Sequence, residues 1–182
     1  EEMTRERPPY ILWLHWKNFY VHDALDERPL VVVRDKKVLD PNPAAEARGI
    51  QRGMPQRQAA NLIQGCVFRS WDREEFVERQ TQWLDICSEF TGILEPIDQH
   101  IAALDLSGHP RRMETTEKLI RDLIARMRLP LCYGVAHTKW MAQLACMRED
   151  PGFAVRDPQG FLASLPVDDL LPVAPEHRAR LE

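Results

Sequence analysis

Long apolar runs are missing from this chain of 182 residues, and so are internal repeats and low-complexity segments. No stretch approaches the roughly 20 apolar residues that a membrane-spanning helix requires. Residues 1–9 are acidic and contain proline, unlike a secretory signal peptide. We therefore expect a globular, cytoplasmic protein with no membrane partner, folded as one large domain or two small ones.

Cysteine pairs are missing as well. The four cysteines lie at positions 66, 87, 132 and 146, and no two of them form a CxxC motif. This spacing argues against a zinc site and against a disulfide framework. Three of the four lie within apolar runs, so we expect buried free thiols.

An excess of positive charge is the third absence. The chain has 24 Lys and Arg against 28 Asp and Glu, a formal net charge of −4. Proteins that hold nucleic acid over a large surface are usually basic, so this balance argues against such a surface within these residues. A smaller basic patch is still compatible with a net charge of −4.

The hydrophobic pattern predicts an α/β (α+β) protein. Apolar or β-branched runs predict strands at 10–15, 28–34, 93–97, 101–106 and 129–135. Helices are expected from Asn18 to about Asp26, after Asp72, at 114–127 and at 138–147. The order β-β-α-β from residue 93, joined to the first β-α, predicts an antiparallel ferredoxin-like sheet with helices on one face. Proline, glycine and small residues between 41 and 69 indicate a small subdomain.

Residues 95–108, EPIDQHIAALDLSG, carry the most information. They resemble, without a gap, the palm motif E-P-L-S-I-D-E-A-Y-L-D-L-T-G of Y-family (DinB/UmuC-type) translesion DNA polymerases. Where that family has its Asp-Glu pair, this chain has His100 and Ile101.

Four further segments resemble the same family in the expected order. They are the first palm strand at 11–20, the fingers stretch at 47–55, the segment 133–142 and the run 161–174 that leads into the thumb. The resemblance implies a ferredoxin-like palm at 1–35 and 70–165, a fingers subdomain at 36–69 and the start of a helix-hairpin-helix thumb at 166–182. The rest of the thumb and the little finger would lie outside these residues, so we expect a fragment.

Two-metal nucleotidyl transfer needs carboxylates, because Mg²⁺ prefers oxygen ligands. By the resemblance, the three family carboxylates fall on His15, His100 and Ile101. Imidazole is a poor Mg²⁺ ligand, and an isoleucine offers no lone pair. Lys17, two residues from His15 on a strand, would add positive charge on the same face. We expect that Mg²⁺ binding is lost and that no other cofactor replaces it.

Contacts to the triphosphate are altered too. The family's fingers motif N-Y-E-A-R falls on residues 42–46, where its Tyr has become Pro43 and its Arg has become Glu46. Two substrate-binding positions persist as vestiges. Lys139 matches the lysine that reaches the phosphates, and Tyr20 matches the residue that rejects a ribose 2′-OH.

The lost ligands predict a pseudo-polymerase without enzymatic activity. Among relatives with lost ligands, the chain is similar to the bacterial ImuB type. That resemblance implies a non-catalytic adaptor, scaffold or DNA-binding subunit in translesion synthesis and damage-induced (SOS) mutagenesis. Its implied partners are the sliding clamp, a RecA-like mutasome partner and a replicative-type polymerase, with DNA bound through C-terminal domains beyond these residues.

Two alternatives from other classes stay open at this point. An active but divergent polymerase could recruit Asp98 or Asp105 as replacement metal ligands. A His-based metal-dependent hydrolase could use His15, His100 and Asp98 to hold Zn²⁺ or Fe²⁺.

Overall fold

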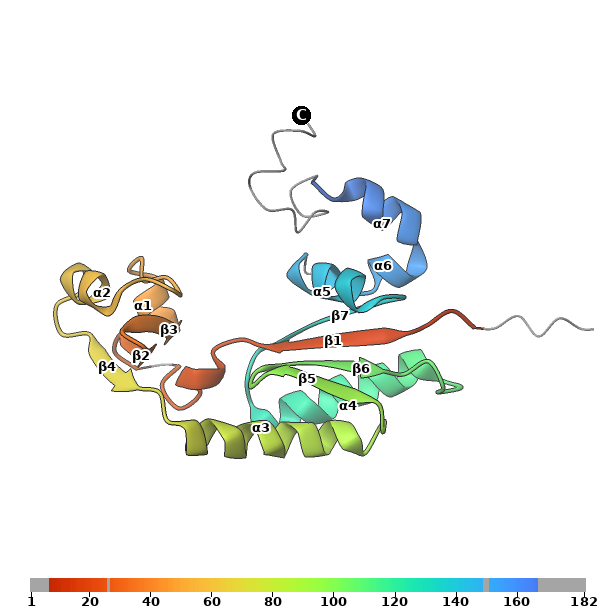
Figure 1. Ribbon diagram of the computed structural model, residues 1–182, viewed down its shortest axis with the longest axis horizontal. Helices are drawn as coiled ribbons and strands as arrows, with labels where there is room; N and C mark the ends of the chain where they lie inside the picture. Colours follow the sequence, from red (N-terminus) through yellow and green to blue (C-terminus); the bar gives the residue numbers. More distant parts are fainter. Residues whose placement is uncertain (1–6, 26, 149–150, 167–182) are drawn as a thin grey trace, which may run out of the picture.

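The computed structural model describes residues 7–25, 27–148 and 151–166 (Figure 1). The expected thumb at 166–182 lies, apart from Pro166, outside the described residues. Within the part that is described, no helix is both long and apolar enough to cross a membrane.

A four-stranded antiparallel sheet forms the palm. Its strands are β1 (Ile11–Trp16), β5 (Leu94–Asp98), β6 (Ile101–Asp105) and β7 (Leu131–Ala136), in the order β5-β6-β1-β7. Counted within this sheet alone, the order is 2-3-1-4, that of the ferredoxin-like fold. The expected β-α-β-β-α-β order is therefore confirmed, but its first helix is the one after Asp72 and not the helix expected at 18–26.

The two crossover helices cover one face of this sheet. Helix α3 (Arg73–Ser88) begins at Asp72, whose carboxylate accepts the backbone N–H groups of Glu74 and Glu75, as the sequence predicts. Helix α4 (Arg112–Met127) packs beside it and buries Leu119 and Leu123. The large core between these helices and the sheet includes Trp16, Trp83 and Phe76.

Helices also cover the opposite face, so the expectation of helices on one face only was wrong. Helix α5 (Lys139–Met147) packs on β7 and β1, and α6 (Phe153–Arg156) and α7 (Pro158–Ser164) extend this layer (Figure 1). The reason is that β1 is apolar on both sides: Leu12 and Leu14 join the α3/α4 core, whereas Trp13 joins a second core with Phe161. At Gly134 the backbones approach so closely that an added Cβ would collide with Ala142 and Cys146.

The fingers subdomain is inserted between β1 and α3. It contains a second sheet of β2 (Leu30–Arg34), β3 (Lys37–Pro41) and β4 (Val67–Ser70), in the order β3-β2-β4, with α1 (Pro43–Glu46) and α2 (Gln56–Leu62). Strand β4 pairs with β2 in parallel and was not predicted. Strand β2 pairs with β3 and β4 of this second sheet. If the fingers are defined by strand pairing, they begin at Leu30, whereas the sequence analysis places their first residue at 36.

The segment after β1 differs from the expected helix of residues 18–26. Only one 3₁₀ turn forms, η1 (Phe19–Val21), and Asn18 adopts a left-handed conformation (φ 56°) without a capping hydrogen bond. Phe19, Tyr20 and Val21 are all buried, so this turn is fixed by packing on the core. A helix with one solvent-facing side would have exposed part of this apolar run.

The cysteines are all free, as expected. Cys87 and Cys146 are buried, whereas Cys66 and Cys132 are only partly buried. The prediction of buried thiols therefore applies to two of the four.

Candidate functional site

Two histidines meet where β1 approaches the turn between β5 and β6. His15 lies in β1, directly opposite Ile101 of β6. His100 lies in the turn just before Ile101, and its carbonyl oxygen accepts the backbone N–H of Trp16 at 2.9 Å. The two imidazole centroids are 5.1 Å apart, with their planes at 69°. The fold thus brings together the three positions that the resemblance assigns to metal-binding carboxylates.

Burial and nearby cations keep this histidine pair neutral. Desolvation lowers the pKa of His15 to about 4, and the neighbouring His100, Arg52 and Lys17 contribute to this decrease, against a smaller opposing effect of Asp98. Desolvation also lowers the pKa of His100, with Asp98 opposing and Arg52 adding to the decrease. The site therefore disfavours added positive charge, as the sequence argument about Lys17 predicts.

The residues present do not fit a two-magnesium centre. Mg²⁺ selects oxygen ligands in octahedral geometry, whereas this site offers two imidazoles and the aliphatic Ile101. Across residues 7–25, 27–148 and 151–166, no group of three or more His, Cys, Asp or Glu side chains is arranged to hold a metal ion.

The two proposed replacement carboxylates occupy different places. Asp98 Oδ2 lies 4.0 Å from His100 Nδ1, and more than half of the Asp98 side chain is exposed. Asp105 pairs with Ile11 at the far end of β6, about 13 Å along the strand from Ile101. Its carboxylate accepts the backbone N–H of Ser107. Only Asp98 is therefore brought to the histidine pair.

Tyr20 and Gln99 form a polar centre that the sequence did not indicate. The Tyr20 hydroxyl donates to Gln99 Oε1 at 3.2 Å and lies 3.4 Å from His100 Nδ1. Trp71 Nε1 donates to the same Gln99 oxygen, and Trp83 Nε1 donates to the Gln99 carbonyl. Burial raises the pKa of Tyr20, so its phenol stays protonated. Gln99 lies within the palm-like segment 95–108, but the family motif has an apolar isoleucine at this position and so assigns it no polar role. Its partners Tyr20 and Trp71 are distant in sequence, so no pattern marks the contact.

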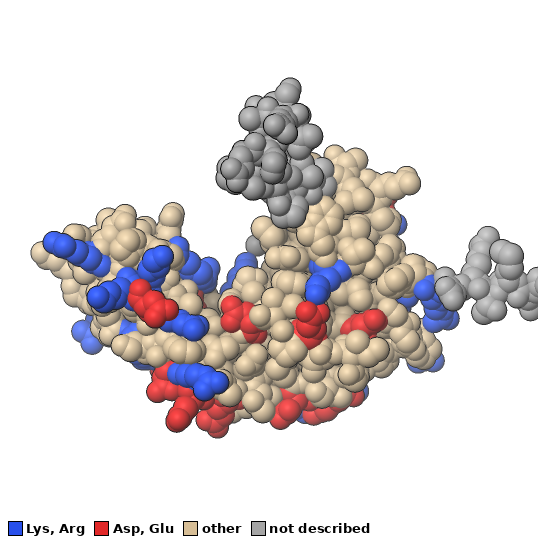
Figure 2. Space-filling view, viewed as in Figure 1, with Lys and Arg blue, Asp and Glu red and all other residues tan. Residues whose placement is uncertain are grey.

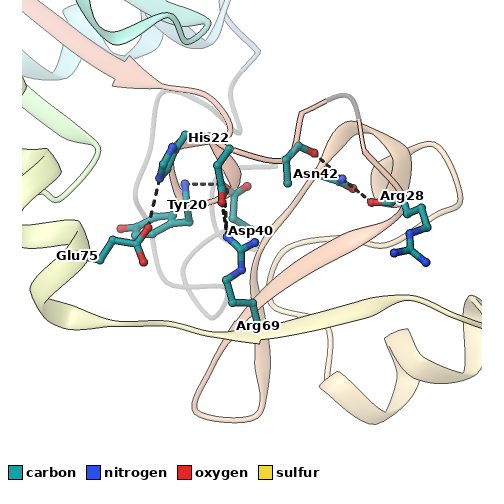
Figure 3. A network of polar contacts seen from close by, with 9 residues as sticks. Tyr20, His22, Arg28, Asp40, Asn42, Arg69 and Glu75 are labelled. Atoms are coloured by element: carbon teal, nitrogen blue, oxygen red, sulfur yellow. Dashed lines mark hydrogen bonds and ion pairs between the residues drawn. The ribbon is translucent and has the colours of Figure 1, made fainter.

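A buried carboxylate connects the fingers to this centre. Asp40 is 2% exposed. Its Oδ2 accepts the backbone N–H of Tyr20 at 3.1 Å (Figure 3). Its Oδ1 accepts from the Arg52 guanidinium at 2.9 Å. Desolvation raises the pKa of Asp40, and Arg52 opposes the increase. Asp40 and Arg52 were missed, because their pairing depends on the β3 fold.

Asn42 is the first residue of the segment aligned with N-Y-E-A-R, and it has a structural role. It is fully buried, and its Oδ1 accepts the backbone N–H groups of Leu30 and Ala45, so it caps α1. Its Nδ2 donates to the carbonyls of Ala24 and Arg28 at 2.8 and 2.9 Å (Figure 3). Every hydrogen-bonding atom of this amide is therefore satisfied at the base of the fingers.

The remaining aligned positions have other partners. Pro43 begins α1, and Glu46 lies 4.0 Å from Arg52. Lys139, at the start of α5, forms an exposed ion pair with Glu95 of β5 at 2.8 Å. Lys139 therefore lies on the same sheet face as Trp13, and its ammonium group is paired with the Glu95 carboxylate.

A ferredoxin-like palm with an inserted fingers subdomain is the architecture of Y-family DNA polymerases, and solved structures confirm the likeness. The crystal structure of DinB from Sulfolobus solfataricus superposes with a TM-score of 0.75 at 18% identity, covering 94% of this chain and 56% of that one. At this identity the match shows the fold alone.

The family model described as "impB/mucB/samB family" matches residues 18–147, so this chain belongs to that family. DNA polymerase IV of Listeria monocytogenes serotype 4a is 27% identical over 158 residues, 80% of this chain and 44% of the relative. DNA polymerase IV of Alkalilimnicola ehrlichii is 30% identical over 171 residues, 87% of this chain and 48% of the relative. The chain thus spans less than half the length of these two polymerases.

Proposed function

We propose that this protein is a non-catalytic member of the Y family that serves as an adaptor or DNA-binding subunit in translesion synthesis and damage-induced mutagenesis. One observation carries the proposal: the palm frame is preserved, but its metal-binding positions hold His15, His100 and Ile101. A two-metal mechanism cannot use this donor set, because an uncharged imidazole pair and an alkyl group supply none of the negative oxygens that clamp two Mg²⁺ ions.

The surroundings of the pair support the same proposal. Lys17 and Arg52 already oppose positive charge at His15. Glu46 stands where the family has a phosphate-pairing arginine, and Lys139 is engaged by Glu95. The glutamate at position 46 and the pairing of Lys139 with Glu95 each weaken the binding of a triphosphate. Catalysis requires both the metal ions and this triphosphate binding.

The wider role rests on the resemblance to the ImuB type. In this proposal the protein acts in the cytoplasm with a sliding clamp, a RecA-like partner and a replicative-type polymerase. Its contacts to these partners would lie in C-terminal segments outside this 182-residue chain.

Primer extension by the full-length protein tests the loss of catalysis. We expect no incorporation above an enzyme-free blank with either Mg²⁺ or Mn²⁺. Robust incorporation that disappears in Asp98→Ala would overturn the proposal and establish the divergent polymerase, because Asp98 is the one candidate carboxylate near the pair.

A restored variant sharpens the test. His15→Asp/His100→Asp/Ile101→Glu should gain Mn²⁺ binding in an electron paramagnetic resonance titration. It should still fail to extend a primer, since Pro43 and Glu46 leave the triphosphate without its clamp. The same titration of the unaltered protein should show no stoichiometric metal.

A further inference from the structure

Strand β7 forms one edge of the palm sheet (Figure 1). Along an antiparallel edge strand, backbone groups point alternately toward the neighbouring strand and away from it. Lys17 donates its backbone N–H to the Pro130 carbonyl at 2.9 Å, and this contact fixes the register: the even-numbered residues of β7 bond to β1. The backbone groups of Leu131, Tyr133 and Val135 therefore face outward.

The last of these three outward positions is closed. Val135 donates its N–H to the Pro151 carbonyl at 2.8 Å. At Leu131 and Tyr133, no residue within the described ranges 7–25, 27–148 and 151–166 bonds to the outward N–H or C=O. Unpaired backbone groups at the edge of a sheet are a template for another strand.

The opposite edge of the sheet, β5, is blunted. Asp105 donates its N–H to the Ile93 carbonyl, so the alternation turns Pro96 outward. Proline has no N–H to donate, and the pairing with β6 becomes irregular directly after Pro96. Both features discourage the addition of a strand. Strand β7 contains no proline, and its pairing with β1 is regular.

Two adjoining pockets flank the open part of β7. One, of about 250 Å³, has Pro130 and Cys132 in its wall, and the other, of about 300 Å³, has Met113 of α4 and Val155 of α6. Tyr133 lines both pockets. Side chains on one side of a strand recur every two residues, about 6.6 Å apart. Apolar side chains two residues apart on an added strand can therefore enter successive pockets.

The charged residues of the pocket walls include both signs: Lys17, Glu117 and Arg156. Figure 2 shows Lys and Arg gathered over the fingers, and Asp and Glu along the edge of the palm that bears α3. The pocket walls have no comparable excess of one charge. An uncharged apolar partner therefore suits this edge better than a polyanion does.

We propose that the open edge of β7 binds a short extended peptide segment of a partner protein, with apolar residues at alternating positions. The peptide backbone bonds to the outward groups of Leu131 and Tyr133, and its apolar side chains fill the two pockets. A second copy of this chain fits less well, because its own Leu131 and Tyr133 line its own pockets and are not available to fill those of the first copy. The proposal adds a partner contact to the adaptor role, and it does not depend on the loss of catalysis.

Fluorescence anisotropy with a fluorescein-labelled peptide, K-T-L-T-L-T-L-T-E, tests the site on the purified 182-residue chain. We expect saturable binding. The peptide K-T-T-T-T-L-L-L-E has the same composition without the alternation, and it should bind about fivefold more weakly or worse. Met113→Glu places a charge in the wall of the second pocket and should weaken binding of the alternating peptide about fivefold or more.

Ile93→Glu is the matched control, since Ile93 is 66% exposed, close to the 63% of Met113, but lies directly before β5 at the opposite edge. It should bind the alternating peptide like the unaltered chain, and thermal melts should show both variants folded. The proposal is overturned if the alternating peptide does not bind, if the two peptides bind equally, or if Ile93→Glu weakens binding as much as Met113→Glu.

Amide hydrogen exchange followed by NMR gives a second readout. The Tyr133 N–H should exchange fast in the free chain and slowly at saturating peptide, whereas those of Cys132 and Gly134, which face β1, should exchange slowly in both. Protection of the Tyr133 N–H in the free chain would overturn the proposal. A dimer in analytical ultracentrifugation that Met113→Glu dissociates would assign the edge to a second copy instead. These outcomes are independent of primer extension, so the two proposals can fail separately.

Discussion

The base of the fingers and the histidine pair are both polar regions set into the fold, but they differ in what their polar atoms do. At the base of the fingers, Asn42 and Asp40 satisfy backbone groups and a guanidinium, so each has partners fixed by the fold. At the pair, His15 and His100 stack edge to face beside cations that keep them uncharged. The base of the fingers connects the fingers to the palm. The histidine pair keeps the arrangement of the family's metal site but lacks its negative charge.

Asn42→Ala is the variant from which we expect the largest loss of stability. It removes an N-cap and leaves the Leu30 N–H and the carbonyls of Ala24 and Arg28 without their partner in a fully buried position. We expect the free energy of unfolding to fall by about 3 kcal/mol. Urea denaturation measures the change, and Asn61→Ala, on the exposed side of α2, is the control that should change it little. Equal effects of the two variants would refute a structural role for Asn42.

The histidine pair should appear as a pH dependence of stability. Because the pKa of His15 is lowered to about 4 in the folded chain, the unfolded chain binds more protons between about pH 6.5 and 4. Stability is therefore lost as the pH falls through this window. We expect His15 to account for a loss on the order of 2 kcal/mol, discounted for its partial exposure.

Unfolding curves of His15→Gln at several pH values would check this. The variant should flatten the dependence of the free energy of unfolding on pH between about pH 4 and 6.5. A slope identical to that of the unaltered chain in His15→Gln would show that the pair is not the titrating group.

The smallest effect is expected at the ion pair between Lys139, a family-matched residue, and Glu95. Both side chains are about half exposed, so water and salt screen their attraction. A double-mutant cycle of Lys139→Ala and Glu95→Ala should give a coupling energy of less than about 1 kcal/mol. A coupling of several kcal/mol would mean that the pair fixes the position of α5.

Much of the fold could be predicted because its signals are local. The Asp72 cap, the α4 stripe and the order of the palm strands each depend on residues close in sequence. Strand β4 could not be predicted, because Val67 and Ser70 are exposed and its parallel pairing with β2 spans the whole fingers insertion. The second helix layer was misjudged for a related reason: only the assembled sheet shows that β1 is buried on both sides.

The candidate site was predictable in position but not in its surroundings. The aligned motif placed His15, His100 and Ile101 together, and the register of β1 and β6 confirms that they are neighbours. Gln99, Asp40 and Arg52 could not have been found in this way. Asp40 of the fingers accepts from the backbone of Tyr20, and Arg52 pairs with Asp40 within the fingers. The partners of Gln99 come from three separate segments, and all of these pairings follow from three-dimensional packing.

The missing side chain at Gly134 has a consequence for the surface that carries Lys139. Helix α5 rests there on bare main chain, so its height above the sheet is set by peptide groups and not by an interdigitating residue. Even a methyl group at this point would act as a wedge and lift the whole helix. The absence of a Cβ atom at Gly134 therefore sets the distance between helix α5 and the sheet.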